Sequence, residues 1–311
     1  MLPRVSAEYR KTPANSLPAV HPQRYLVLGT AQLAVGAAAI FARFALSGAP
    51  PLAVAAARLS IAAAILLAIA AIKPLSPPAR HVTLAAAGVA LAAHFGTWIW
   101  SLQYTSVAAS TLLVATTPVW TALYDQAVRR RPLSGRAWLA MAAGGAGVAL
   151  VAAAHGARAP VPGHALLGDL LAVCGAIAIA AYFLMIRTVP ASFGTRGIVT
   201  HTYAYAALVL IAASMAARQR PPALSDGVAW GGIAAMALIS QLLGHTAMNA
   251  ALRWFSANAV AFSTLVEPVV AAVLALMIFR EPVSALTACG GVLVLAAVAV
   301  FLREDVRAQS A

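Results

Sequence analysis

Ten apolar stretches, each about 20 residues long and separated by short polar connections, constrain this chain more than any other feature. An α-helix of about 20 residues is roughly 30 Å long, which matches the hydrocarbon core of a bilayer. Only 9% of the residues are charged, against roughly 25% in soluble domains. We therefore predict an all-α membrane protein with ten transmembrane helices. The predicted spans are 26–45, 52–72, 82–101, 107–128, 136–154, 167–186, 197–216, 227–249, 257–279 and 283–302.

Basic residues are distributed unequally between the two sides of this arrangement. Fifteen of the 21 Lys and Arg residues fall on the side of both termini, five fall on the other side, and Arg58 lies within the second span. Because cytoplasmic loops carry the excess of Lys and Arg, both termini are predicted in the cytoplasm, with the protein in a bacterial inner (plasma) membrane. Residues 1–24 are polar and proline-rich and are predicted to be a disordered cytoplasmic arm, and residues 303–311 a cytoplasmic tail. The net charge of +13 is scattered, so no nucleic-acid partner is expected.

Two segments that lie 150 residues apart reveal an internal repeat. The segment "SLQYTSVAASTLLVATTPVW" (101–120) aligns without gaps on "ALRWFSANAVAFSTLVEPVV" (251–270). Each half therefore contains five spans, at 25–155 and 156–302, and an odd number makes the second half enter the membrane from the opposite side. Two inverted five-helix repeats are typical of transporters that alternate access around a central site.

The paired segments "YTSVAASTLLVATTPV" and "FSANAVAFSTLVEPVV", together with the ten spans, resemble the EamA family of the drug/metabolite transporter superfamily. The resemblance covers nearly the whole chain after residue 25. It implies a carrier whose central cavity is lined mainly by spans 1–4 and 6–9, with spans 5 and 10 peripheral. Many relatives export amino acids or other small metabolites, and amino-acid exporters of the YddG kind are the nearest type that the resemblance suggests.

Glu267 is the acidic residue that a membrane helix tolerates least, because the other seven lie at span ends, in loops or in tails. A carboxylate near the bilayer centre costs about 2.5–3.5 kcal/mol on insertion scales. Ser263 and Thr264 lie one turn earlier on the same helical face and offer hydrogen bonds. Glu267 is expected either to bind a cationic substrate group or a coupling proton, or to be a structural acid that holds span 9 to its neighbour.

Pro118 and Pro268 occupy equivalent positions in spans 4 and 9. Proline has no N–H, so each should free the carbonyl four residues earlier, on Val114 or Thr264, for a ligand, water or hydroxyl. We predict that the two prolines are hinges; the alternative is that each is a static kink to which the packing adapts.

Polar side chains recur at helical spacing on five further spans. In lipid their donors would be unsatisfied, so these faces should turn inward, either to a substrate cavity or to hydrogen bonds between helices worth about 0.6 kcal/mol per pair. Arg58 could extend to the outer surface or could bind a substrate carboxylate. The predicted substrate-binding residues, with Glu267, are Gln32, His94, Trp98, Ser110, Thr117, His201, Tyr205, Gln241, His245, Asn249 and Ser263.

Enzyme motifs are missing from the sequence. It contains no HExxH, no pair of intramembrane aspartates and no rhomboid serine motif, so no catalytic residue is predicted. A haem held by His94 and His245 and a purely structural scaffold are distant alternatives. We predict a secondary transporter without cofactor or metal, a monomer in the lipid bilayer, that exports small metabolites and above all amino acids. A carrier of drugs, quaternary amines or other amphipathic or cationic compounds is the closer alternative.

Overall fold

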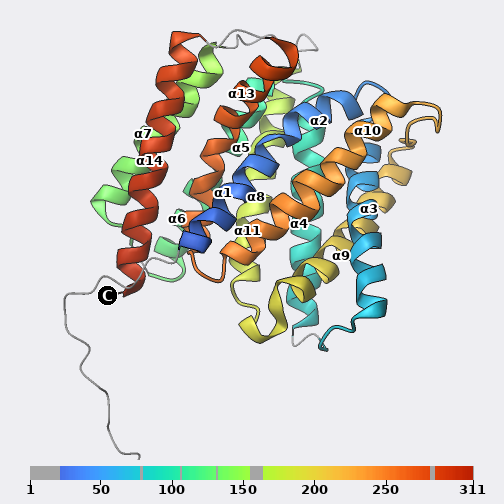
Figure 1. Cartoon of the computed structure of the whole chain (residues 1–311), viewed down its shortest axis with the longest axis horizontal. Helices are drawn as coiled ribbons and strands as arrows, with labels where there is room; N and C mark the ends of the chain where they lie inside the picture. Colours follow the sequence, from blue (N-terminus) through green and yellow to red (C-terminus); the bar gives the residue numbers. More distant parts are fainter. Residues whose placement is uncertain are drawn as a thin grey trace, which may run out of the picture.

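The computed structural model of the protein describes residues 22–77, 80–105, 107–130, 132–154, 164–280 and 284–310. Within these residues every regular element is helical, and ten helical segments form one bundle (Figure 1). The arm predicted at 1–24 lies outside the described residues except for its last three residues, which already belong to the first helix. The chain is an all-helical membrane protein.

The ten segments, in chain order, are α1 (Pro22–Gly36) with α2 (Ala38–Ala45); α3 (Pro51–Ile72); α4 (His81–Ser101); α5 (Val107–Val114) with α6 (Thr117–Ala127); α7 (Gly135–Ala154); α8 (Ala165–Ile186); η1 (Ala191–Phe193) with α9 (Gly194–Ala216); α10 (Gly227–Ala235) with η2 (Met236–His245) and α11 (Thr246–Ala251); α12 (Ala257–Ser263) with η3 (Thr264–Val266) and α13 (Glu267–Phe279); and α14 (Ala285–Ser310). Eight of them are long and apolar enough to cross a membrane. The other two are the interrupted fourth segment and the fifth, whose apolar part is Gly135–Val151.

The fourth and ninth segments are interrupted at equivalent places. α5 ends at Val114 and α6 begins at Thr117; in the ninth segment the 3₁₀ turn η3 separates α12 from α13. Each new helix has a proline, Pro118 or Pro268, directly after its first residue. Proline lacks a donor and is tolerated in the first turn of a helix, where no intrahelical partner is needed. The prolines therefore divide both spans into two helices.

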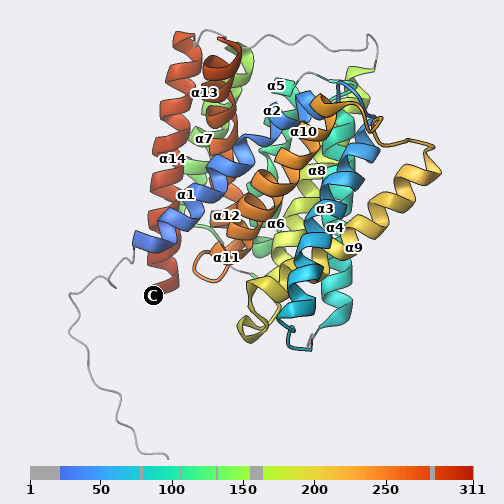
Figure 2. The same cartoon turned by 45° about the vertical axis from the view of Figure 1, so that its right-hand side comes forward.

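We call the end of the bundle at which α1 begins and α14 ends the terminal face, and the other end the opposite face (Figures 1 and 2). Helix α14 continues through most of the predicted tail and has 26 residues, or roughly 39 Å. Its last turns are polar: Glu304 pairs with Arg307 at 3.0 Å and lies 3.9 Å from Arg136. The helix is thus longer than the hydrocarbon core and extends past it at the terminal face.

Contacts between the halves repeat on the two faces of the bundle. On the opposite face, the ring of Tyr104, in the connection before α5, lies 6.0 Å from the ring of His164 at the start of α8. On the terminal face, Phe255, in the connection before α12, lies 5.3 Å from Tyr25 in α1. The same type of contact therefore joins each half to the first segment of the other, as inverted repeats require.

The two peripheral segments, α7 and α14, lie side by side (Figures 1 and 2) and cross at a pair of glycines. A Cβ on Gly147 would lie 2.8 Å from the carbonyl oxygen of Gly290, and a Cβ on Gly290 would lie 2.6 Å from that of Gly147. Only glycine permits two helix backbones to approach this closely. The reciprocal contact again reflects the symmetry of the two repeats.

Candidate functional site

A cavity of about 50 Å³ lies in the middle of the bundle, where the interruptions of the fourth and ninth segments meet α1, α3, α4, η2 and α11. Its volume is far below the roughly 300–1,000 Å³ of pockets for drug-sized ligands. Six of the residues predicted from the sequence line it, namely His94, Trp98, Thr117, His245, Glu267 and Pro268. The structure thus brings together predicted residues from four different spans.

Glu267 begins α13 and is half-buried at the cavity. Among the residues that the structure describes, its carboxylate accepts no hydrogen bond and has no ion-pair partner. The Ser263 hydroxyl, one turn earlier, instead donates to the carbonyl of Val260, and that of Thr264 to Ala261. The acid is therefore not held by the side chains that the sequence placed beside it.

The backbone carbonyls opposite the two prolines are both satisfied. The Thr117 hydroxyl donates to the carbonyl of Val114 at 2.6 Å. The backbone N–H of Glu267 donates to the carbonyl of Thr264, because the chain tightens into the 3₁₀ turn η3 before the proline. At Val114 the freed carbonyl is thus taken by a hydroxyl, one of the three expected partners. At Thr264 the expectation is wrong, because a backbone N–H takes the carbonyl.

Arg58, in α3, also lines the cavity, and its side chain is fully buried. Its Nε donates to Oε1 of Gln241 at 3.1 Å, and the guanidinium lies 4.0 Å from the centroid of the Phe95 ring. Nη1 and Nη2 have no hydrogen-bond partner within the described part of the chain. Arg58 does not extend to the surface, since it is held inward by an amide and an aromatic ring.

Two histidines and a tryptophan form an aromatic wall of the cavity. The ring of His94 is nearly parallel to that of Trp98, with 6.2 Å between centroids, and lies 6.5 Å from that of His245. Nδ1 of His94 lies 3.0 Å from the carbonyl oxygen of Gly175, so it carries a hydrogen and leaves Nε2 as an acceptor. A porphyrin is much larger than this cavity, so haem ligation by the two histidines does not fit the structure.

Metal binding also finds no support in the described ranges, where no three His, Cys, Asp or Glu side chains converge on one point.

Seven predicted substrate-site residues and one predicted hinge do not line the cavity. Gln32 donates to Ser263 at 2.8 Å, Asn249 accepts from Tyr182 at 2.8 Å, and Gln241 accepts from Arg58. Ser110 lies 2.7 Å from the hydroxyl of Ser101, and Nδ1 of His201 lies 2.8 Å from the carbonyl oxygen of Gly197. Tyr205 packs against Gly88, and Pro118 is buried in the first turn of α6. The bond between Gln32 and Ser263 joins the two halves across 231 positions of sequence. Gln32, Ser263, Gln241, Asn249 and Ser110 thus form hydrogen-bonded seams between segments, whereas His201 bonds within α9.

The eighth segment contains a π-helical stretch, η2, that includes Gln241 and His245. Such wide turns displace backbone carbonyls from regular helical hydrogen bonds. The carbonyl of Gln241 instead accepts from the hydroxyls of Tyr203 at 3.3 Å and Thr246 at 3.4 Å. Sequence periodicity did not predict this stretch, which places Gln241 beside Arg58 and His245 in the cavity wall.

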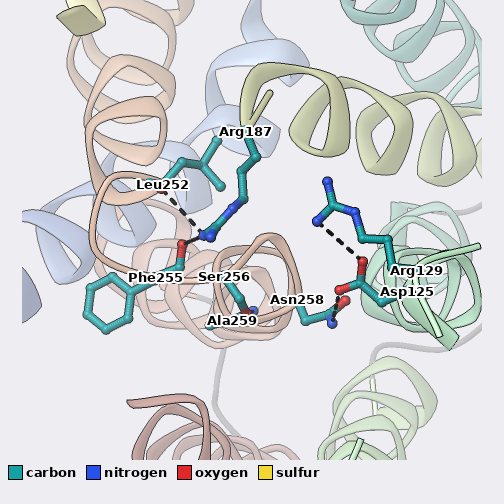
Figure 3. A network of polar contacts seen from close by, with 8 residues as sticks. All are labelled: Asp125, Arg129, Arg187, Leu252, Phe255, Ser256, Asn258 and Ala259. Atoms are coloured by element: carbon teal, nitrogen blue, oxygen red, sulfur yellow. Dashed lines mark hydrogen bonds and ion pairs between the residues drawn. The ribbon is translucent and has the colours of Figure 1, made fainter. Parts of the chain in front are cut away.

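A second polar cluster, which we call the terminal network, lies near the terminal face (Figure 3). Nδ2 of Asn258, in α12, donates to Oδ2 of Asp125, in α6, at 2.9 Å, and Arg129 lies 3.6 Å from the other oxygen of that carboxylate. Arg187, at the end of α8, donates to the carbonyls of Leu252 and Phe255. The terminal network therefore ties the fourth segment to the ninth, and the sixth segment to the connection that precedes the ninth.

The terminal network has no counterpart in the sequence of the opposite face. At the offset of 150 residues, Asn258 aligns with Ala108 and Asp125 with Ala275. Alanine has no side-chain donor or acceptor, so the buried polar pair can exist at one face only.

Comparisons with known proteins agree with this architecture. The EamA-like transporter family matches the chain over residues 24–153 and again over residues 166–303. The chain belongs to the EamA-like transporter family. Like other EamA-like transporters it is a multi-pass membrane protein and a secondary transporter of small molecules, and it is not an enzyme.

A solved crystal structure shares the fold of this EamA-like transporter, with a TM-score of 0.73 at 17% sequence identity. The match covers 93% of this chain and 99% of the other one. At this identity the likeness concerns the fold alone. No curated protein matches the chain.

Sequence reasoning missed two features of this EamA-like transporter. It did not decide whether Arg58 extends to the outer surface or binds a substrate, although an arginine inside an apolar span usually faces the interior of the bundle. It also placed Asp125 among the span-end acids, since its partner Asn258 is 133 positions away and no local pattern connects them.

Proposed function

We propose that this EamA-like transporter exports small metabolites, and specifically amino acids, from the cytoplasm across a bacterial inner membrane by alternating access. The observation that carries this proposal is Glu267, whose carboxylate has no partner among the described residues and lies beside a cavity in the middle of the bundle. An acid at this depth in the membrane costs free energy unless it has a partner. The amino group of a substrate is a partner that would offset this cost.

Side chains of the cavity wall complete the proposed site. His94, Trp98, Thr117 and His245 present ring nitrogens, an indole and a hydroxyl around Glu267. The seams contain Gln32, Ser110, Gln241, Asn249 and Ser263, and we propose that they hold the helices that carry the site. His201 and Tyr205 lie outside both the cavity and the seams.

Alternating access is supported by the interrupted fourth and ninth segments. Both are interrupted beside the cavity, next to Pro118 and Pro268, so we propose that the two prolines are hinges. The terminal network would then be the closed gate of one face, and its rupture would open the cavity to that face. With the basic residues concentrated there, we propose that the terminal face is cytoplasmic, and that the transporter acts as a monomer.

A specific observation favours a second candidate substrate class. Trp98 and His94 stack in the wall of the cavity that Glu267 also lines, an arrangement that attracts organic cations through the aromatic face. Small quaternary amines are therefore the alternative substrates. The cavity volume of about 50 Å³ favours small compounds over bulky drugs.

Counterflow in proteoliposomes tests the proposed function. Purified protein is reconstituted, the vesicles are loaded with unlabelled compound, and uptake of the same labelled compound is measured for amino acids, small amines and sugars, with and without a pH gradient. We expect saturable counterflow for at least one amino acid and none in protein-free vesicles. Counterflow of amines alone would favour the second candidate, and no saturable flux for any compound would contradict a carrier of these substrates.

A further inference from the structure

We propose that Arg58 is the carboxylate-binding residue of the transport site, so that the substrates are zwitterions whose carboxylate meets Arg58 and whose amino group meets Glu267. This inference rests on the proposed function and defines its substrate class further. It gives a partner to the substrate carboxylate, which neither Glu267 nor the aromatic rings of the cavity would bind.

The hydrogen bonding of Arg58 is incomplete in a way that points to a ligand. Arg58 is fully buried, and its Nε is the only guanidinium nitrogen with a hydrogen-bond acceptor in the described structure, the side-chain oxygen of Gln241. Nη1 and Nη2 are both buried and unpaired. A buried cation with unmade hydrogen bonds is strongly unfavourable, and the outer pair of nitrogens of a guanidinium matches the two oxygens of a carboxylate.

The orientation of Arg58 is fixed by its neighbours rather than by a counter-ion. Gln241 holds one edge of the guanidinium and the Phe95 ring covers one face. The Phe95 ring also packs edge-on against His245, with 5.0 Å between centroids, so it cannot swing away freely. The two remaining nitrogens are therefore held in position beside the cavity that Arg58 lines.

Glu267 and Arg58 line the same cavity but form no ion pair with each other. They interact only electrostatically across it. If the protein needed simply to neutralise these charges, a direct salt bridge would do so with both groups desolvated together. Two opposite charges held apart in one small cavity match the separated charges of a zwitterion, and an α-amino acid is the smallest metabolite class with that pattern.

A substrate series that removes the carboxylate charge and keeps the amino group tests this assignment. The wild-type transporter is assayed in proteoliposomes with an amino acid, its amide, and the amine that lacks the carboxylate. The amine cannot form the hydrogen bonds between the carboxylate and the charged guanidinium. The kcat/KM for the amino acid should therefore be about 10- to 100-fold higher than that for the amine. Equal kcat/KM values for the amino acid and the amine in the wild type would overturn the inference without any variant.

Variants locate the effect on Arg58. In Arg58→Met the ratio should fall to near one, because the amine never used the guanidinium, and Arg58→Lys should retain part of the preference through its charge. Arg220→Met removes an exposed arginine and should keep the wild-type ratio. If Arg58→Met loses amino-acid and amine transport to the same extent, Arg58 supports the structure only and the inference fails while the proposed function stands. If the wild type carries no amino acid at all, the proposed function fails and the inference with it.

Discussion

Asn258→Ala should shift the protein away from the conformation in which the terminal face is closed. In the structure Asn258 donates to the buried carboxylate of Asp125 at 2.9 Å, and the exposed fractions of the two residues are 3% and 9%. The substitution removes one hydrogen bond to a charged group, which is worth about 1.5–3 kcal/mol. If that hydrogen bond exists only in the closed conformation, the ratio of closed to open molecules falls about 10- to 100-fold.

Distance measurements between two spin labels can follow this change. Labels are placed at Gln126 in α6 and Arg253 before α12, both exposed, in a background without Cys174 and Cys289. Asn258→Ala should add a population with a longer distance that the parent lacks. Thr188→Ala is the control, since the hydroxyl of this exposed residue, in the turn after α8, donates to the carbonyl of Met185 only three residues earlier. A distance distribution unchanged by Asn258→Ala would refute the role of the terminal network as a gate.

Two glycine substitutions probe helix approach, with Gly145→Ala as the control for both because a Cβ there meets no atom within 4 Å. Gly290→Ala places a Cβ 2.6 Å from the carbonyl oxygen of Gly147, which should lower the free energy of unfolding by about 1–3 kcal/mol. The apparent unfolding temperature in detergent should fall with it, and an unchanged unfolding temperature would contradict the close crossing. Gly36→Ala places a Cβ 2.6 Å from that of Val270, beside the cavity, and should reduce transport more than it reduces stability; wild-type flux would show that this approach of α1 to α13 is not needed.

Much of the architecture could be predicted from the sequence because a bilayer imposes a length on every apolar stretch. The alignment of the two halves located both interrupted helices, since proline marks them. The break after Gly36 and the π-helical stretch at Met236–His245 carry no such signal. Both lie where the first and eighth segments contact each other, as in the hydrogen bond from Ser240 to the carbonyl of Ala34.

The candidate site was harder to predict. Helical periodicity shows which residues share one face of a helix, but it does not show what that face contacts. His94, His245 and Glu267 were predicted to face inward and do line the cavity. Gln32 satisfied the same pattern, yet it hydrogen bonds to Ser263 in a seam, because the rotation of α1 is set by packing against the other half. Which polar residue meets a cavity and which meets another helix is decided by long-range contacts that one sequence does not display.

Amino-acid flux through Glu267→Gln proteoliposomes, compared with the wild type, tests the central claim most directly. The substitution keeps the size of the side chain and removes the charge that the account assigns to the substrate amino group. We predict that saturable amino-acid counterflow falls about 10-fold or more, as expected for the loss of a hydrogen bond to a charged group, while the unfolding temperature is retained. Unchanged amino-acid flux in Glu267→Gln would contradict the claim that this carboxylate is the centre of the transport site.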